Sequence, residues 1–176
     1  RVFIWPWSDS YKAIYKPYLS AEDYPETLAG LQKKYDFNIS LIRHLFKDQE
    51  RLLKYLHDNT EWRMVYYDEN SAVFLRDTFE NMEAIRKYGI DFSKKKLDAS
   101  DTDIHIANFF QKIGELELAE EIYLKLLAVN PRYLEVGNNL AVIYINTGRL
   151  EDGVKLINRF LEYYPKSKEL CANIET

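Results

Sequence analysis

The sequence predicts a small α/β module with a mixed β-sheet, followed by an all-α region of paired helices. Residues 1–90 alternate short, apolar, β-prone runs with helical patterns. From about residue 102 the chain nearly repeats itself at an offset of 34 residues, which indicates stacked helical hairpins. The balance of charge also changes, since residues 1–97 carry 16 Lys/Arg and 15 Asp/Glu, whereas residues 98–176 carry 8 and 13. These observations predict a module at 1–92, a linker at 93–101 and a repeat region at 102–176.

Composition narrows the possible functions. A hydrophobic fraction of 47% predicts a packed protein, and a net charge of -4 argues against a nucleic-acid surface. The single cysteine, Cys171, excludes an internal disulfide, and no apolar run reaches the roughly 18 residues that a membrane span needs. The chain begins at Arg1 directly on an apolar run and without Met, so we expect a fragment whose targeting signals lie upstream.

The first part of the α/β module is predicted to run strand, helical turn, helix. Residues 2–5 are apolar and β-prone, and a proline follows them. Residues 11–15 follow a Ser-Asp-Ser cap and form a short helical turn. Pro25 suits the first position of a helix, whose apolar positions then recur at helical spacing up to residue 35.

The second part is predicted to run strand, helix, hairpin, helix. Residues 37–42 alternate as a strand does, and Asp48 opens a helix with a leucine-rich face. Residues 62–67 and 72–75 flank a polar turn and form a β-hairpin. A last helix spans residues 78–88. The first two strands should be parallel, because helices join them, and the last two antiparallel.

The repeat region is predicted to hold four helices, at residues 102–113, 116–129, 134–146 and 150–163. Small residues recur where paired helices approach each other, glycines where the turn is tight, and prolines where the second helix must stop. The matched pairs are Ala107 with Ala141, Ala119 with Gly153, Gly114 with Gly148, and Pro131 with Pro165. Phe110, Tyr123, Tyr144 and Ile157 are expected to fill the space between hairpins, and residues 166–176 to cap the pair.

This order of small, aromatic and small residues and proline at period 34 resembles the tetratricopeptide repeat. The resemblance implies that a protein or peptide partner binds along the concave face formed by the first helix of each pair. The candidate groove residues on that face are Asn108, Gln111, Lys112, Asn138, Asn139 and Asn146. A merely soluble helix face is the alternative interpretation, and the sequence leaves both open.

One known use of the family is a clamp for a terminal carboxylate. Asn108 and Asn139 stand where its asparagines would be, but Ile104 stands where its first lysine would be. Without the cations a carboxylate would lose water with too little compensation, so the sequence excludes the clamp.

The α/β module resembles the extracytoplasmic C-terminal region of polytopic bacterial membrane glycosyltransferases of the dolichyl-phosphate-mannose mannosyltransferase-like superfamily. The resemblance covers residues 1–90 and includes a Trp-x-x-Val-Tyr-x-Asp phrase at Trp62, Val65, Tyr66 and Asp68. Residues 5–7 depart from it, since relatives carry an acidic and a basic residue there. In that superfamily the catalytic acid lies in an early loop that this chain lacks. The resemblance therefore implies a location and no catalytic residue in this fragment.

No set of residues indicates a metal, a cofactor or an active site. The histidines His44, His57 and His105 are scattered, and the adjacent acids Asp68 and Glu69 lie in a predicted turn. An aromatic cluster near the N-terminus could stack on sugars or lie at a membrane interface, although packing against the module is the favoured interpretation. Its members are Trp5, Trp7, Tyr11, Tyr15, Tyr18 and Tyr24.

Together these features predict a non-catalytic, extracytoplasmic C-terminal region of a multi-pass, glycosyltransferase-like membrane protein of bacteria. It would mediate protein–protein interaction or position an acceptor. The alternative is a free-standing soluble scaffold, which would be cytoplasmic.

Overall fold

The chain divides into two compact units, Arg1–Lys95 and Lys96–Thr176. We call them the α/β unit and the helical unit. The structure, a computed structural model, describes residues 20, 21, 23–45 and 49–173. The division between the units follows Lys95, inside the segment 93–101 that was expected to link the two modules.

Within the described residues, the α/β unit combines three strands with short helices, where η marks a 3-10 helix. In chain order the elements are η1 (Pro25–Thr27), α2 (Leu28–Tyr35), β1 (Ile39–Arg43), α3 (Glu50–Asp58), β2 (Trp62–Tyr67), β3 (Ser71–Arg76), η3 (Phe79–Asn81), α4 (Met82–Tyr88) and η4 (Phe92–Lys94). The 3-10 turn η1 begins at Pro25 and leads directly into α2, as the proline predicts.

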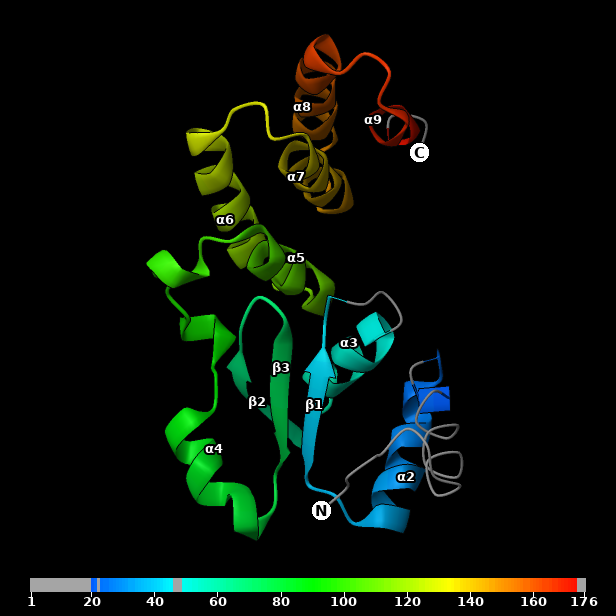
Figure 1. Cartoon of the computed structure of the whole chain (residues 1–176), viewed down its shortest axis with the longest axis vertical. Helices are drawn as coiled ribbons and strands as arrows, with labels where there is room; N and C mark the ends of the chain where they lie inside the picture. The colour runs from blue at the N-terminus through cyan, green and yellow to red at the C-terminus, as the bar shows by residue number, and fades with distance from the viewer. Residues whose placement is uncertain (1–19, 22, 46–48, 174–176) are drawn as a thin grey trace, which may run out of the picture. The chain divides into compact units, whose positions relative to one another are not determined.

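The three strands form an antiparallel sheet in the order β1-β3-β2, with β3 in the middle (Figure 1). Phe74 of β3 pairs with Ser40 on one side and Met64 on the other. The predicted hairpin is confirmed by the antiparallel pairing of β2 and β3. The expected strand at residues 2–5, and with it the expected parallel pairing, lies outside the described residues.

The core of the α/β unit lies on one face of this sheet. Strand alternation places Ile42, Phe74 and Met64 on that face, and all three are buried. Helix α3 contacts β2, and three of its leucines are fully buried. The opposite face is partly exposed, since Ile39 and Leu41 on β1 are exposed whereas Leu75 of β3, which pairs with Ile39, is buried.

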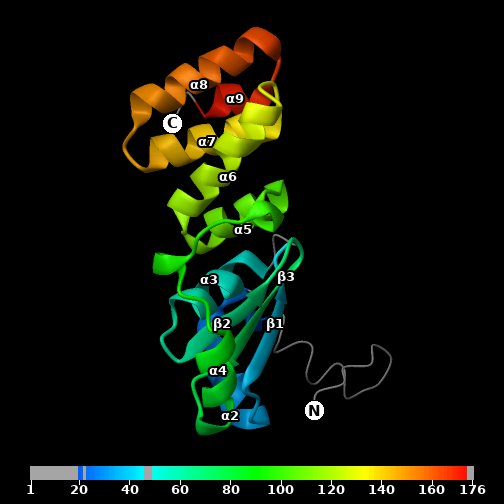
Figure 2. The same cartoon turned by 90° about the vertical axis from the view of Figure 1, so that its left-hand side faces the viewer.

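The helical unit begins with a short 3-10 turn and continues as two helical hairpins and a short final helix. Its elements are η5 (Ala99–Asp101), α5 (Ile104–Ile113), α6 (Leu116–Val129), α7 (Leu134–Asn146), α8 (Leu150–Tyr163) and α9 (Lys168–Ala172). Helix α5 packs on α6 and α7 on α8, and α9 lies beside α8 (Figure 2). The four long helices therefore match the predicted ranges to within two residues. No helix in the described part of the chain is long and apolar enough to cross a membrane.

Two glycines form the turns within the hairpins. Gly114 has φ = 92° and Gly148 has φ = 81°. In this left-handed region a side chain strains the backbone. Gly114 therefore ends α5, and Gly148 permits the turn from α7 into α8.

Small residues let the paired helices touch. A Cβ atom on Gly153 would lie 2.7 Å from Ile145 Cγ1 and 3.1 Å from the carbonyl oxygen of Ala141. Gly137 provides space in the same way, because a Cβ there would lie 2.2 Å from Cζ of the fully buried Phe160. The small positions of the repeat are therefore packing requirements of the α7–α8 pair.

Candidate partner-binding site

Helices α5 and α7 bring polar amides together around the hydroxyl group of Tyr123 on α6. This hydroxyl lies 2.6 Å from Asn108 Oδ1 and 2.8 Å from Gln111 Oε1. Asn139 Nδ2 donates to Asn108 Oδ1 at 2.9 Å and lies 3.4 Å from the Tyr123 oxygen. We call Asn108, Gln111 and Asn139, with the hydroxyl of Tyr123, the amide cluster. It joins both hairpins, since α5 and α6 form the first and α7 belongs to the second.

Burial of Tyr123 fixes the chemical state of this hydroxyl. The residue is fully buried, and burial raises the pKa of its phenol well above the ordinary value. The phenol is therefore a hydrogen-bond donor at every physiological pH. It has one hydrogen, so at any moment it donates either to Asn108 or to Gln111.

The amides keep polar atoms that other groups can use. Among the described residues, Gln111 Nε2 and Asn139 Oδ1 make no hydrogen bond. Asn108 Nδ2 has one long contact, of 3.4 Å, to Glu135 Oε1. The cluster thus offers two amide donors and one amide acceptor next to a buried anchor.

The other three candidate residues stand apart from the cluster. Asn138 Oδ1 accepts a hydrogen bond of 2.8 Å from Asn173, just beyond α9. Lys112 is half-buried near the end of α5, and Asn146 is exposed as the last residue of α7. The structure therefore gathers Asn108, Gln111 and Asn139, and it assigns Asn138 to the contact with the C-terminal segment.

A second polar group joins the two hairpins away from the amide cluster. Arg149 donates to both carboxylate oxygens of Glu120, at 2.8 Å and 2.5 Å, and its guanidinium lies 4.3 Å from the centre of the Tyr144 ring. The Arg149 hydrogen bonds lower the pKa of Glu120. Burial raises the pKa of Tyr144, and the nearby negative charge of Glu120 raises it further. This group holds α6 against the turn between α7 and α8.

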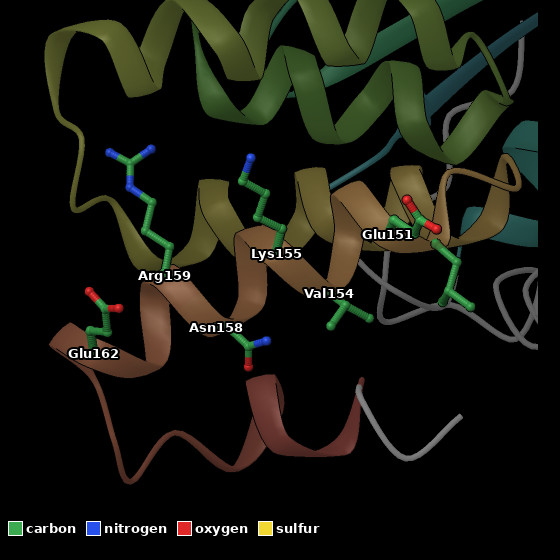
Figure 3. Close-up of a pocket in the computed structure, with 7 residues that line it drawn as sticks. Glu151, Val154, Lys155, Asn158, Arg159 and Glu162 are labelled. Carbon is green, nitrogen blue, oxygen red and sulfur yellow. The ribbon is translucent and has the colours of Figure 1, made fainter.

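The outer surface of α8 carries a wide hollow that lacks a convergent site. All the side chains that line it come from this one helix (Figure 3). Lys155 and Arg159 project to one side, whereas Val154 and Asn158 project to the other. Side chains on the surface of one helix point away from each other, so they do not converge on a ligand. We therefore interpret this hollow as solvated helix surface.

Two of the remaining sequence candidates, Asp68 and His44, have structural roles in the β2–β3 turn. Asp68 Oδ1 accepts from the N–H groups of Asn70 and Ser71, each at 2.8 Å, and so closes the β2–β3 turn. Burial alone would raise the pKa of Asp68, but hydrogen bonds from Asn70, Tyr66 and Ser71 together lower it. His44 is buried, and its Nε2 lies 2.8 Å from the carbonyl oxygen of Asp68.

Of the aromatic cluster, Tyr24 is 61% exposed. Its other members lie outside the described residues. Cys171 is an exposed free cysteine.

Sequence reasoning missed the central role of Tyr123. It assigned this residue to filling space, although its counterpart 34 residues later, Ile157, has no hydroxyl. A tyrosine in a core position needs a partner for its hydroxyl group, and this was the available signal. The need for such a partner could have indicated the amides on the neighbouring helices α5 and α7.

Comparison with known families supports the repeat. Residues 104–133 and 135–167 each match the tetratricopeptide repeat model. Searches of curated proteins and of solved structures found no match. The two matched ranges contain the hairpins α5–α6 and α7–α8 except for Leu134, together with every residue of the amide cluster. Residues 104–167 of the helical unit therefore match the tetratricopeptide repeat both in sequence and in the arrangement of their helices.

Proposed function

We propose that the helical unit binds an extended peptide segment of a protein partner at the amide cluster. Tetratricopeptide repeats generally bind protein partners, and the three amides of the cluster lie on the first helices of the two repeats. An extended peptide presents alternating N–H and C=O groups, which need acceptors and donors at fixed positions. Asn139 Oδ1, Asn108 Nδ2 and Gln111 Nε2 offer both kinds of atom.

The observation that carries this proposal is the anchoring of surface amides by one buried phenol. An exposed asparagine loses side-chain freedom when it binds a ligand, which weakens binding. Asn108 and Asn139 have already lost part of that freedom, because they hydrogen-bond each other and Tyr123. The remaining donors and acceptor are therefore pre-oriented for a peptide backbone.

The test uses peptides selected on the wild-type protein from a random-sequence display library. Asn108→Ala and Asn139→Ala should each weaken the Kd of a selected peptide by about five- to thirtyfold, which corresponds to about 1–2 kcal/mol. Asn158→Ala on α8 is the matched control, since Asn158 is exposed on the other side of the hairpin and makes no side-chain hydrogen bond within the described residues.

Both alanine variants also remove a partner from Tyr123, so stability must be measured beside affinity. A lower stability by about 1 kcal/mol is expected and leaves the protein folded at the assay temperature. If folded Asn108→Ala and Asn139→Ala bind the selected peptides as tightly as Asn158→Ala does, the amide cluster is not the binding site.

We also propose a setting for this function, on the extracytoplasmic side of a bacterial membrane. The proposed protein is a polytopic, glycosyltransferase-like one, in which residues 1–176 have no catalytic role and position a partner or an acceptor. The support is the resemblance of residues 1–90, whose Trp-x-x-Val-Tyr-x-Asp phrase at Trp62, Val65, Tyr66 and Asp68 spans β2 and the turn after it. A reporter that is active only outside the cytoplasm, fused to the C-terminus of the complete gene product, should be active. An inactive reporter would favour a cytoplasmic scaffold.

A further inference from the structure

The α/β unit contains a hollow of about 340 Å³ that neither the repeats nor the resemblance accounts for. It lies where α2 and the C-terminal end of α3 meet the start of β2 and the end of β3. Its size falls at the lower end of the range of about 300–1,000 Å³ that is usual for small-molecule sites. Leu28 and Tyr55 give it an apolar wall, and the remaining wall is mostly polar.

One wall contains a nearly buried indole with an unused donor. Trp62 is 5% exposed, and its ring packs 6.1 Å from that of Phe37. Over the described ranges its indole N–H has no hydrogen-bond acceptor. Among the described residues, Thr78 Oγ1 is the one buried side-chain polar atom without a partner, so the indole N–H of Trp62 reaches solvent. An acceptor atom of a ligand in the hollow can take the place of water at this N–H.

The charges around the hollow favour an anion. Lys33 and Arg76 contribute two positive charges, and Glu61 contributes one negative charge. Glu61 Oε2 lies 3.2 Å from Arg76 Nη2, with the Glu61 side chain 64% exposed and that of Arg76 31% exposed. Lys33 forms no ion pair within the part of the chain that the structure describes. One positive charge therefore remains uncompensated.

The neutral polar groups are also mainly donors. Asn59 Oδ1 accepts the backbone N–H of Glu61 at 2.8 Å, so the amide nitrogen of Asn59 is the group left for a ligand. Gln32 adds a second amide whose groups form no hydrogen bond among the described residues. Together with the indole and the two cations, these donors match a ligand with closely spaced acceptor oxygens.

We propose that this hollow binds the carboxylate of a small organic acid, with the carboxylate near Lys33, Arg76 and the Trp62 N–H and the apolar body against Leu28 and Tyr55. The carboxylate can belong to a free acid or to the C-terminus of a peptide. This site is independent of the amide cluster, since all its residues belong to the α/β unit.

The test follows the indole N–H signal of Trp62 by nitrogen-15 NMR of the full chain, with Trp62→Phe used to assign it. Benzoate represents a free acid, and N-acetylphenylalanine represents a peptide C-terminus. Each amide counterpart is the neutral control. We expect the carboxylates to shift the indole signal saturably and the amides to bind at least about tenfold more weakly. The tighter of the two carboxylates indicates the source.

Three variants separate this proposal from nonspecific attraction. Lys33→Gln should weaken benzoate binding roughly fivefold, whereas Lys34→Gln should not, because Lys34 lies outside the hollow with its Nζ 5.1 Å from the centre of the Tyr35 ring. Glu61→Gln should tighten binding about two- to fivefold, because it removes the negative charge beside Arg76.

Four results would overturn the proposal: no saturable indole shift, equal binding of the amides, equal effects of Lys33→Gln and Lys34→Gln, or weaker binding after Glu61→Gln. The nitrogen-15 spectrum of each variant reports whether it is folded.

Discussion

Removing a single oxygen atom, in Tyr123→Phe, tests whether the hydroxyl of Tyr123 organises the repeat pair. The ring of Tyr123 is fully buried, and phenylalanine preserves it, so no large cavity forms. The hydroxyl donates one hydrogen bond, over 2.6 Å or 2.8 Å, and receives one long contact of 3.4 Å from Asn139. A hydrogen bond contributes about 0.5–1.5 kcal/mol net. The half-buried amides that lose their partner can bind water instead. We therefore expect the helical unit to lose about 1 kcal/mol of stability.

Native-state hydrogen exchange of the backbone amides of α6 measures this change, because it reports the opening of the helical unit separately from the α/β unit. Tyr133→Phe is the control. Tyr133 belongs to the same unit, and its hydroxyl makes no hydrogen bond to any residue that the structure describes. We expect this variant to change the free energy of opening by less than about 0.3 kcal/mol. If Tyr123→Phe were as stable as Tyr133→Phe, the amide cluster would not be anchored by the phenol, and the argument for pre-oriented amides would fail.

Three further substitutions test the packing of small residues and the electrostatics of the repeats. Gly137→Ala places a Cβ atom 2.2 Å from the buried ring of Phe160. We expect the free energy of opening of α7 and α8, measured by hydrogen exchange, to fall by about 1–3 kcal/mol. Gly30→Ala in α2 meets nothing within 4 Å and should instead stabilise its unit by roughly 0.5–1 kcal/mol, and equal losses at both glycines would refute the steric account. Glu120→Gln should cost about 1 kcal/mol near neutral pH, because it breaks a two-pronged ion pair with Arg149. Since the folded-state pKa of Glu120 is lowered, its contribution is complete above the unfolded pKa and disappears as pH falls through the folded pKa. The free energies of unfolding of the wild-type protein and Glu120→Gln, measured in urea, should therefore become equal in acid. A difference between them that does not depend on pH would contradict this.

The helical unit could be predicted closely because its determinants are local. Gly114 and Gly148 mark the turns, and the structure gives both a positive φ. The prolines and the small residues follow the same 34-residue period as the packing they permit. Each signal lies within a few residues of the feature that it specifies, so a single sequence is enough to place four helices.

The sheet could be predicted only in part, because strand pairing joins distant residues. The β2–β3 hairpin is local, and its turn residues indicate it. The pairing of β1 with β3 joins Ile39 to Leu75 and places β3 in the centre. Period-2 alternation gives each strand its two faces, but it does not say which strand lies beside which.

The amide cluster was predictable as a surface but not as a network. Helical spacing placed Asn108 and Gln111 on one face of α5 and Asn139 on α7. The contact between them depends on how α7 packs against the first hairpin, and Tyr123 enters from a third helix. Such a meeting point is a tertiary property that periodicity does not encode.

Helix α9 packs on the second repeat and limits where a partner can bind. A repeat pair would normally leave one apolar face open, and about three repeats are usual. Here Leu170 of α9 is fully buried in a cluster with Ala141, Ile157 and Phe160, so α9 covers part of the apolar face of the second repeat. This closure also engages a candidate binding residue, because Asn173 hydrogen-bonds Asn138. The amides that retain unused donors and acceptors then lie between α5 and α7. We therefore expect a partner that binds through backbone contacts to place a short stretch of peptide at this junction. Asn138→Ala should then loosen the packing of α9 and leave the affinity for the selected peptides unchanged.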